Sequence, residues 1–226
     1  MRLTYYGQSC FAVEIEEKTL LFDPFITPNE LANNIDINSI KADFILLSHG
    51  HADHVADAVT LAKKTKALVI SSFEVINWLS EKGIERTHPM NLGGQWQFEF
   101  GKVKCTNAVH SSAMPDGTYG GNPMGFLITS AKTSFYYSGD TALTMDMQLI
   151  PRWAKPDFAV LPIGDNFTMG YEDAIIASEM IQCKNIVGVH YDTFGFIKID
   201  HQKVKTAFTN AGLNLILPAI GESIEL

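Results

Sequence analysis

The sequence predicts a mixed α/β fold in which helices cover β-sheets. Short runs rich in β-branched and aromatic residues recur along the chain, the first three of them are joined by turn signals, and later runs alternate with segments of helical periodicity. The chain has 226 residues, of which 46% are hydrophobic and 19% charged, as in an ordinary globular protein. At about 150 residues per domain, this length allows one large domain or two small ones.

Strands are expected throughout the chain. The runs 2–6, 11–15 and 19–22 are separated by the turn signals Gly7-Gln8 and Glu17-Lys18, which predicts an antiparallel meander. Further strand-like runs are 44–48, 67–71, 96–100, 102–109, 125–129, 134–138, 158–162, 185–189 and 213–217.

Helices are expected at 55–65, 73–81, 171–182 and 201–211, between the later strands. The third segment has one apolar face at helical spacing, made by Ala174, Ile175, Ala177, Ser178 and Ile181. In the second segment, the stripe of Phe73, Ile76 and Leu79 is expected to pack in the core.

The charge balance is acidic, with 17 Lys and Arg against 25 Asp and Glu and a formal net charge of −8. A protein that follows a phosphate backbone usually carries a basic stripe, so we expect no long nucleic acid as partner. The densest basic group is Lys63, Lys64 and Lys66. A small-molecule substrate is expected, an anionic one included, and a homo-oligomer is compatible with the sequence.

Cys10, Cys105 and Cys183 are far apart and lie in apolar or strand-like runs, which predicts buried free thiols. The N-terminus has no apolar signal core, and no apolar run approaches the ~18 residues of a membrane span. These features together predict a cytoplasmic protein.

Histidine and aspartate residues follow five of the strand-like runs. The run 44–48 leads into Ser48-His49-Gly50-His51-Ala52-Asp53-His54, and the other four lead to Asp23, His110, Asp140 and His190. The carboxyl ends of strands form the ligand crevice in open α/β sheets. Imidazole and carboxylate groups are the ligands of Zn²⁺ and similar ions. In a tight loop, His49 and His51 would face one ion and Asp53 and His54 a neighbouring one, so we infer two metal ions.

The ligand positions also indicate how the chain is divided. The histidines up to His110 lie in the first half, whereas Asp140 and His190 lie in the second. Neither half could complete the site alone, so we expect one domain over residues 1–226. His88, before Pro89 in a polar loop, and His201, near a helix start, are expected to take no part in it.

The H-x-H-x-D-H segment with its distant histidines and aspartate resembles the signature of the metallo-β-lactamase superfamily. The segments Gly7–Phe11, 21–24, 164–170 and 190–194 are similar to those of its short, uncharacterised metal-dependent hydrolases, near the ascorbate-6-phosphate lactonase branch. The resemblance covers the whole chain. It implies a four-layer αβ/βα sandwich of two facing sheets with helices outside.

The resemblance also implies roles for individual residues. The first ion would be held by His49, His51 and His110, and the second by Asp53, His54 and His190. Asp140 would bridge the two ions, and Asp23 would orient a ligand histidine. The predicted catalytic residues are Asp53, Asp140 and His190. Zn²⁺ is favoured by the five histidines, while Mn²⁺ and Fe remain compatible.

The expected function is hydrolysis of an ester, lactone, amide, thioester or phosphodiester bond of a small molecule, by a hydroxide held between two divalent ions. Two alternatives stay open. One is a lactonase for a phosphorylated sugar lactone, and the other is a non-catalytic metal-binding or sensor domain on the same scaffold.

Asp165, Thr168 and Tyr191 are the candidate substrate-binding residues. The first two lie between a strand and a helix, where capping of the helix is an equal alternative. Tyr191, together with Phe194 and Phe196, would wall the pocket or simply pack. The segment 111–123, which follows His110, is either a mobile lip or a plain connecting loop.

Overall fold

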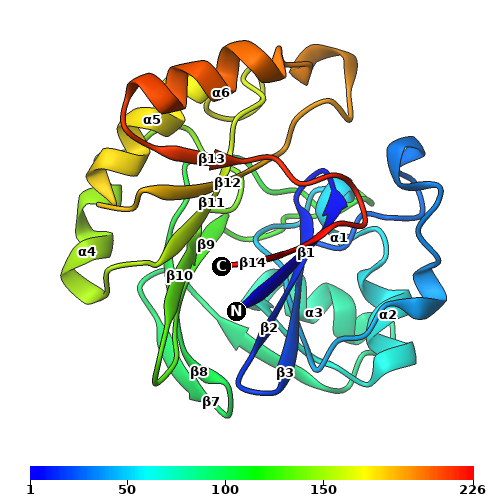
Figure 1. The fold of residues 1–226 in the computed structure, drawn as a ribbon. Helices are drawn as coiled ribbons and strands as arrows, with labels where there is room; N and C mark the ends of the chain where they lie inside the picture. Colours follow the sequence, from blue (N-terminus) through cyan, green and yellow to red (C-terminus); the bar gives the residue numbers. More distant parts are fainter.

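The computed structural model describes residues 1–226 and contains two facing seven-stranded sheets with helices on their outer sides (Figure 1). The first sheet has the order β14-β1-β2-β3-β4-β5-β6. Its strands are β1 (Arg2–Gly7), β2 (Cys10–Ile15), β3 (Lys18–Phe22), β4 (Phe44–Leu46), β5 (Leu68–Ser72), β6 (Thr87–Met90) and β14 (Ser223–Glu225). The predicted antiparallel meander of β1, β2 and β3 is confirmed, and β3 to β6 run parallel.

The second sheet has the order β13-β12-β11-β10-β9-β8-β7. Its strands are β7 (Gln95–Phe98), β8 (Gly101–Asn107), β9 (Met124–Thr129), β10 (Ser134–Tyr137), β11 (Phe158–Pro162), β12 (Asn185–Val189) and β13 (Asn214–Ile216). Strands β7 to β10 pair antiparallel, whereas β10 to β13 pair parallel.

Helices cover the outer face of each sheet, so the predicted four-layer sandwich is confirmed (Figure 1). The α-helices are α1 (Ala52–Val55), α2 (Ala58–Thr65), α3 (Phe73–Glu81), α4 (Ile150–Trp153), α5 (Tyr171–Met180) and α6 (His201–Asn210). Short 3-10 helices are η1 (Glu30–Ala32), η2 (Ile37–Ser39), η3 (Met145–Leu149) and η4 (Gly195–Ile197). No helix has the length and apolar character needed to cross a membrane.

The central strands are buried on both faces, which explains their nearly continuous apolar sequences. In β2, Phe11 and Val13 point into the core between the sheets, while Ala12 points to the outer core under α2 and α3. Aromatic rings cross the central core, with Phe11 and Tyr137 packed edge-on at a centroid distance of 5.0 Å. The two sheets are therefore joined by a shared apolar interior.

The expected helix over 55–65 is wrong at its start, because the chain breaks between α1 and α2. The Asp57 backbone N–H donates to the Pro24 carbonyl oxygen instead of continuing the helix. Its buried carboxylate accepts hydrogen bonds from Ile26 N at 2.7 Å and Thr27 N at 2.8 Å. Asp57 thus fixes the segment that follows β3 against the start of α2.

Asp57→Ala is expected to lower the free energy of unfolding by about 3 kcal/mol, because two backbone N–H groups lose a charged acceptor. Urea unfolding monitored by circular dichroism measures this change. The matched control is Asp36→Ala, which removes an exposed cap at Asn38 N and is expected to cost about 1 kcal/mol or less. Equal losses for the two variants would contradict the assigned role of Asp57.

Two edge strands, β6 and β14, were absent from the sequence-based assignment. His88 lies in β6 rather than in a loop, packed against the rings of Trp96 and Phe98 at 5.1 and 4.9 Å. Strand β6 contains Pro89, which an edge strand tolerates. The expected core position of Phe73 is also wrong: its side chain is 55% exposed, because Val75, Ile76 and Leu79 form the buried face of α3. The three cysteines are free and buried, as predicted.

Candidate metal centre

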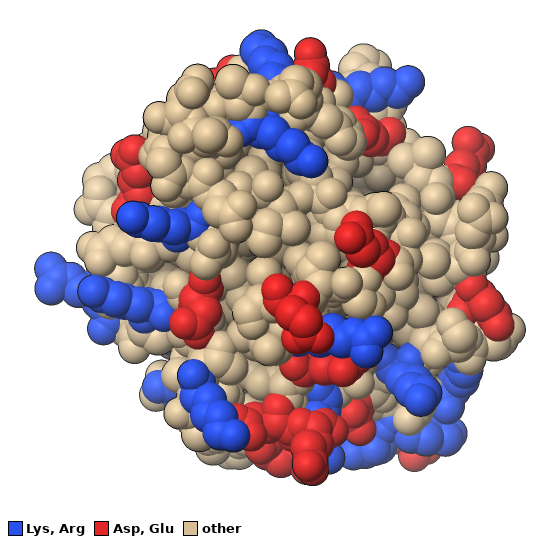
Figure 2. Space-filling view, in the orientation of Figure 1, with Lys and Arg blue, Asp and Glu red and all other residues tan.

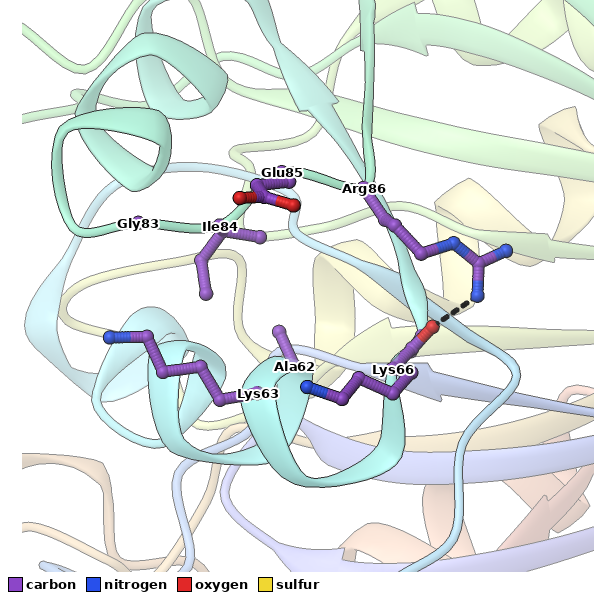
Figure 3. Close-up of a pocket in the computed structure, with 8 residues that line it drawn as sticks. Ala62, Lys63, Lys66, Gly83, Ile84, Glu85 and Arg86 are labelled. Carbon is purple, nitrogen blue, oxygen red and sulfur yellow. Dashed lines mark hydrogen bonds between the residues drawn. The ribbon is translucent and has the colours of Figure 1, made fainter.

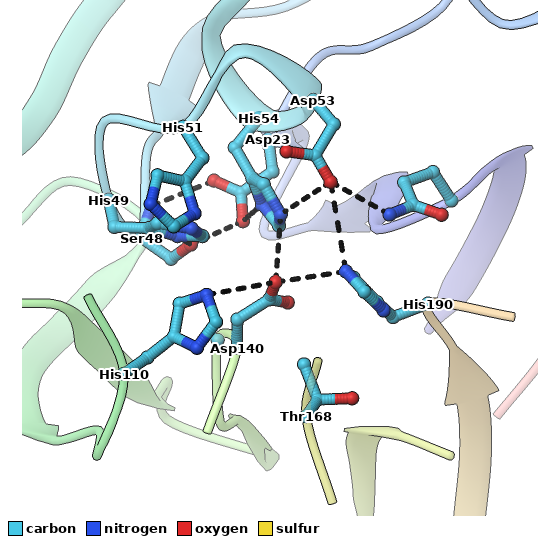
Figure 4. Close-up of polar contacts among 12 residues, drawn as sticks. Asp23, Ser48, His49, His51, Asp53, His54, His110, Asp140, Thr168 and His190 are labelled. Atoms are coloured by element: carbon cyan, nitrogen blue, oxygen red, sulfur yellow. Dashed lines mark hydrogen bonds and ion pairs between the residues drawn. The ribbon is translucent and has the colours of Figure 1, made fainter. Parts of the chain in front are cut away.

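The strands that precede the candidate ligands end at one edge of the sandwich. Strands β3 and β4 are parallel in the first sheet, and β8, β10 and β12 share one direction in the second. Their carboxyl ends bring together residues that are distant in sequence, as Figure 4 shows. Gly139, with φ of 63°, allows this approach, because a Cβ atom there would lie 2.6 Å from the Met124 carbonyl oxygen.

The seven candidate ligands form two adjoining groups, within each of which the ligand atoms lie within 4.8 Å of one another. One group is His49, His51 and His110, and the other is Asp53, His54, Asp140 and His190. Asp53 and His54 lie in the helical turn that begins after His51, and the His54 ring stays close to the first group, with its centroid 4.1 Å from that of His49. This grouping agrees with the partition that the resemblance implies.

Asp140 lies between the two groups. Its Oδ2 atom is 3.1 Å from His54 Nε2, 3.0 Å from His190 Nε2 and 3.8 Å from His110 Nε2 (Figure 4). Asp53 Oδ2 lies 3.4 Å from His54 Nε2 and 3.7 Å from His190 Nε2. The Oδ2 atom of Asp140 therefore faces imidazoles of both groups, whereas that of Asp53 faces only the second.

Several ligand atoms are buried without a hydrogen-bond partner in the protein, among them His49 Nε2, His54 Nε2 and Asp140 Oδ1. Buried polar atoms are normally satisfied, so such a concentration needs an explanation. Imidazole nitrogens and carboxylate oxygens converging on one space are the donor set of a divalent transition metal. The residues present therefore fit metal ions.

Hydrogen bonds around Asp23 determine which ring nitrogen His49 and His54 turn toward the other candidate ligands. Its Oδ2 accepts from His54 Nδ1 at 2.8 Å and from the Ser48 hydroxyl at 2.6 Å, and that hydroxyl lies 2.9 Å from His49 Nδ1. Tyr137 OH also donates to Asp23 Oδ2, at 2.6 Å. With Nδ1 of both histidines engaged, the lone pair on each Nε2 points toward the other ligands. Asp23 thus lies where a histidine-orienting carboxylate is expected.

Electrostatics distinguish the two groups. Burial lowers the pKa of His49, His51 and His110, which favours the neutral imidazole that binds metals. Burial also acts to lower the pKa of His54 and His190, but the adjacent Asp140 carboxylate outweighs it, raising His54 well above its usual pKa and His190 to about 9. In the second group the carboxylates thus attract a cation, whether a proton or a metal ion.

This shift predicts the pH dependence of the metal-free protein. The pKa of His190 is raised from 6.5 to about 9, so its contribution to stability is full below pH 6.5 and is lost as the pH rises through about 9. The free energy of unfolding of chelator-treated protein is expected to fall by about 3 kcal/mol over that interval. Urea unfolding at a series of pH values measures it. His190→Gln should weaken the dependence and leave the part that comes from the raised pKa of His54, and a stability that rises with pH would contradict the prediction.

Gln8 is a residue of the site that the sequence did not reveal. Its Nε2 donates to Asp53 Oδ2 at 2.9 Å, and its backbone oxygen accepts from His190 N at 3.0 Å. The segment Gly7–Phe11 supported the resemblance, but nothing in the sequence indicates that the β1–β2 turn meets the end of β12. Gln8 holds one carboxylate and one histidine of the second group in place.

A cavity of about 480 Å³ opens onto the candidate ligands. It is lined by Phe25, His51, Ala52, Asp53, His110, Ser111, Asp140, Phe167, His190 and Phe194. The segment 111–123 is pinned to α3, because Trp78 Nε1 donates to Asp116 at 2.6 Å. Its first residue, Ser111, contributes to the wall.

None of the three candidate substrate-binding residues lines this cavity. Tyr191 is buried and stacks on Tyr5 at a centroid distance of 6.4 Å. Asp165 is exposed in a turn, where its carboxylate accepts from Asn166 N, and the Thr168 hydroxyl donates to the Met169 backbone oxygen at 3.3 Å, with no polar contact to the ligands in Figure 4. Neither caps α5, because Gly170 is the N-cap.

A second cavity, of about 440 Å³, is lined by Lys63, Lys66 and Arg86, and Arg86 donates to the backbone oxygen of Lys66 (Figure 3). It lies at the amino ends of β5 and β6, the edge opposite to the histidines. Lys63 lies in the last turn of α2 and Lys66 is its C-cap residue, where positive charge complements the helix dipole. Elsewhere, Lys and Arg are interspersed with Asp and Glu on the face shown in Figure 2.

Comparisons of this chain with a family model, with related sequences and with solved structures all point to the same family. Residues 18–191 match the model of the beta-lactamase superfamily domain. The chain is 57% identical to a UPF0173 metal-dependent hydrolase of Christiangramia forsetii and 54% identical to one of Flavobacterium johnsoniae, with full coverage of both chains in each case.

A solved structure extends this likeness to the fold. Igni18, described as a novel metallo hydrolase from the archaeon Ignicoccus hospitalis, superposes with a TM-score of 0.89 at 32% identity, covering 100% of this chain and 98% of that one. The resemblance inferred from the H-x-H-x-D-H segment is confirmed. The chain belongs to the metallo-β-lactamase superfamily and is a metal-dependent hydrolase.

Proposed function

We propose that this enzyme hydrolyses an ester, lactone, amide, thioester or phosphodiester bond of a small molecule, at a site for two divalent ions. The observation that carries the proposal is the position of Asp140 Oδ2, within 3.8 Å of imidazole nitrogens from both ligand groups. His49, His51 and His110 would hold one ion, Asp53, His54 and His190 the other, and Asp140 would contact both. The predominance of imidazole ligands favours Zn²⁺, and Mn²⁺ and Fe also accept this set.

Divalent ions bound there supply Lewis acidity and lower the pKa of a water molecule from 15.7 to about 7. Asp53 and Asp140 both line the cavity, and Asp53 is the more accessible carboxylate, with 21% of its side chain exposed against 2% for Asp140. Although burial acts to raise its pKa, His54 and His190 lower the pKa of Asp53, so it is ionised at neutral pH.

Asp53 is therefore placed to act as a proton carrier. Gln8 Nε2 holds its Oδ2 atom, which leaves Oδ1 for the reacting groups. The carboxylate would accept a proton from the attacking water and return it to the leaving group, so that no net proton is consumed by the enzyme. The imidazoles of His54 and His190, each 3.4 to 3.7 Å from Oδ2, stabilise the ionised form.

The test combines metal content with activity. Purified protein should contain about two divalent ions per chain, lose hydrolysis of at least one of the five bond types on chelation, and regain it with Zn²⁺ or Mn²⁺. His51→Ala should lower that activity by about 100-fold or more. The matched control, His88→Ala, removes a histidine that packs on Trp96 and Phe98 and should change neither quantity. Metal-replete protein inert on all five bond types, or His51→Ala with intact activity, would reject the proposal.

A further inference from the structure

The mouth of the candidate metal centre has three phenylalanine side chains in its wall. Phe25, Phe167 and Phe194 line the 480 Å³ cavity together with the metal-ligand residues. The same three also line an adjoining cavity of about 670 Å³. The remaining lining residues of that cavity are Pro28, Asn29, Glu30, Thr193, Gly195 and Phe196. The two spaces are thus neighbours across one aromatic wall.

Two of the three apolar rings of this wall are exposed. Phe167 is 49% exposed and Phe194 is 37% exposed, whereas Phe25 beneath them is buried. Phe25 packs against Phe194 at a centroid distance of 6.3 Å, and Phe167 packs edge-on against Phe196 at 6.1 Å. A contiguous group of exposed aromatic rings beside a reactive centre is typical of a binding surface.

The segments that carry these rings are held by backbone contacts. Phe167 lies in a turn whose ends, Gly164 and Gly170, form a β-bridge. Phe194 follows Asp192, whose carboxylate accepts from Ile199 N at 3.1 Å and lies 2.6 Å from His201 Nε2. Both rings are therefore placed before any ligand arrives, which lowers the entropic cost of binding.

The charged residues that line the two cavities indicate which class of ligand they can bind. No Lys or Arg lines either of them, and Glu30 is the only charged residue of the adjoining cavity. Side-chain recognition of a phosphate group relies on Arg or Lys. The basic residues Lys63, Lys66 and Arg86 surround a cavity at the opposite edge of the first sheet. This distribution argues against a phosphorylated sugar lactone as substrate.

We propose that the substrate carries an aromatic or similarly bulky apolar group, which packs against Phe167 and Phe194 while the scissile bond faces the metal-ligand residues. The assignment of a scissile bond rests on the proposed hydrolytic function, but recognition of the apolar group does not. Phe167 and Phe194 are then specificity-determining residues, because an aromatic ring enclosed by aromatic side chains removes a large apolar area from water.

Binding of non-reacting probes tests this independently of hydrolysis. Dissociation constants of 3-phenylpropionate, propionate and glucose 6-phosphate are measured by calorimetry on the zinc-loaded protein. 3-Phenylpropionate is expected to bind about tenfold more tightly than propionate. Both acids present the same carboxylate, so their ratio isolates the contribution of the ring. In the double variant that carries both Phe167→Ala and Phe194→Ala, 3-phenylpropionate should bind at most about twofold more tightly than propionate. The single variant Phe167→Ala removes a half-exposed ring and should lower the tenfold ratio by a factor of about three.

The matched control is Phe73→Ala, which removes a ring that is 55% exposed and lines neither cavity, and should keep the tenfold ratio. The proposal is overturned if glucose 6-phosphate binds more tightly than 3-phenylpropionate, or if the ratio survives in the phenylalanine variants. It is also overturned if light scattering shows a dimer that Phe167→Ala converts to monomer, since the wall would then be an interface. Absence of hydrolysis with an intact ring preference would reject only the hydrolytic function.

Discussion

Asp140→Ala is expected to lower kcat/KM by about 1000-fold or more, the largest effect of any single substitution in this chain. Its Oδ2 atom lies within 3.8 Å of His54, His110 and His190, so in the proposed two-ion site one truncation would remove a ligand of both ions. A 1000-fold loss corresponds to about 4 kcal/mol of transition-state stabilisation. The metal content should fall with the activity, because the remaining ligands no longer share an oxygen.

Three measurements on the same preparation check this result: steady-state kinetics, elemental analysis and thermal unfolding. Asp146→Ala is the matched control, since its exposed carboxylate accepts from Asn107 Nδ2 and lies outside the cavity. Asp140→Asn separates shape from charge, because the amide retains the volume of the carboxylate. If Asp140→Asn keeps two ions per chain and full activity, a bridging role for this residue is wrong.

The sequence predicts those parts of the site that are local or that follow strands. His49, His51, Asp53 and His54 lie within one short segment, where the spacing of the residue types already indicates metal binding. The distant candidates follow strand-like runs, and strands of one direction bring their carboxyl ends to one edge. This is why the structure places Asp140 and His190 beside that segment.

Residues whose role depends on long-range packing could not be found in this way. Gln8 lies in a turn, and only the pairing of β1 with β2 and the approach of β12 bring it to Asp53. Phe167 looks like an ordinary loop aromatic until the cavity is known, and for Phe194 the sequence leaves pocket lining and plain packing as alternatives. The same limit explains the broken helix: the periodicity across 55–65 is helical, but the hydrogen bonds of Asp57 to the segment after β3 interrupt it.

Asp23→Ala is expected to weaken metal binding by about 10- to 100-fold without removing any ligand. Asp23 Oδ2 accepts from His54 Nδ1, from the Ser48 hydroxyl and from Tyr137 OH, and Ser48 connects it to His49. Without this carboxylate, the proton can move between the two nitrogens of each imidazole, and both rings can rotate. Each group of ligands would then spend part of its time with the wrong nitrogen toward the ion.

Stability should fall as well, since Asp23 is fully buried and its loss leaves several donors without an acceptor. Breaking a buried charged network typically costs about 3–5 kcal/mol. Competition with a chromophoric chelator measures metal affinity, urea unfolding measures stability, and nitrogen NMR of the imidazoles reports the tautomer directly.

The matched control for this network is Asp43→Ala, which removes an exposed carboxylate that accepts only from Thr19 N at the opposite end of β4. It should leave metal affinity and the imidazole signals unchanged. Tyr137→Phe removes one donor to Asp23 while keeping the ring in the core, so it should lower metal affinity less than Asp23→Ala does. Wild-type metal affinity and unchanged imidazole tautomers in Asp23→Ala would contradict this prediction. The hydrogen bonds of Asp23 would then be dispensable, and packing alone would orient His49 and His54 with Nε2 toward the ion.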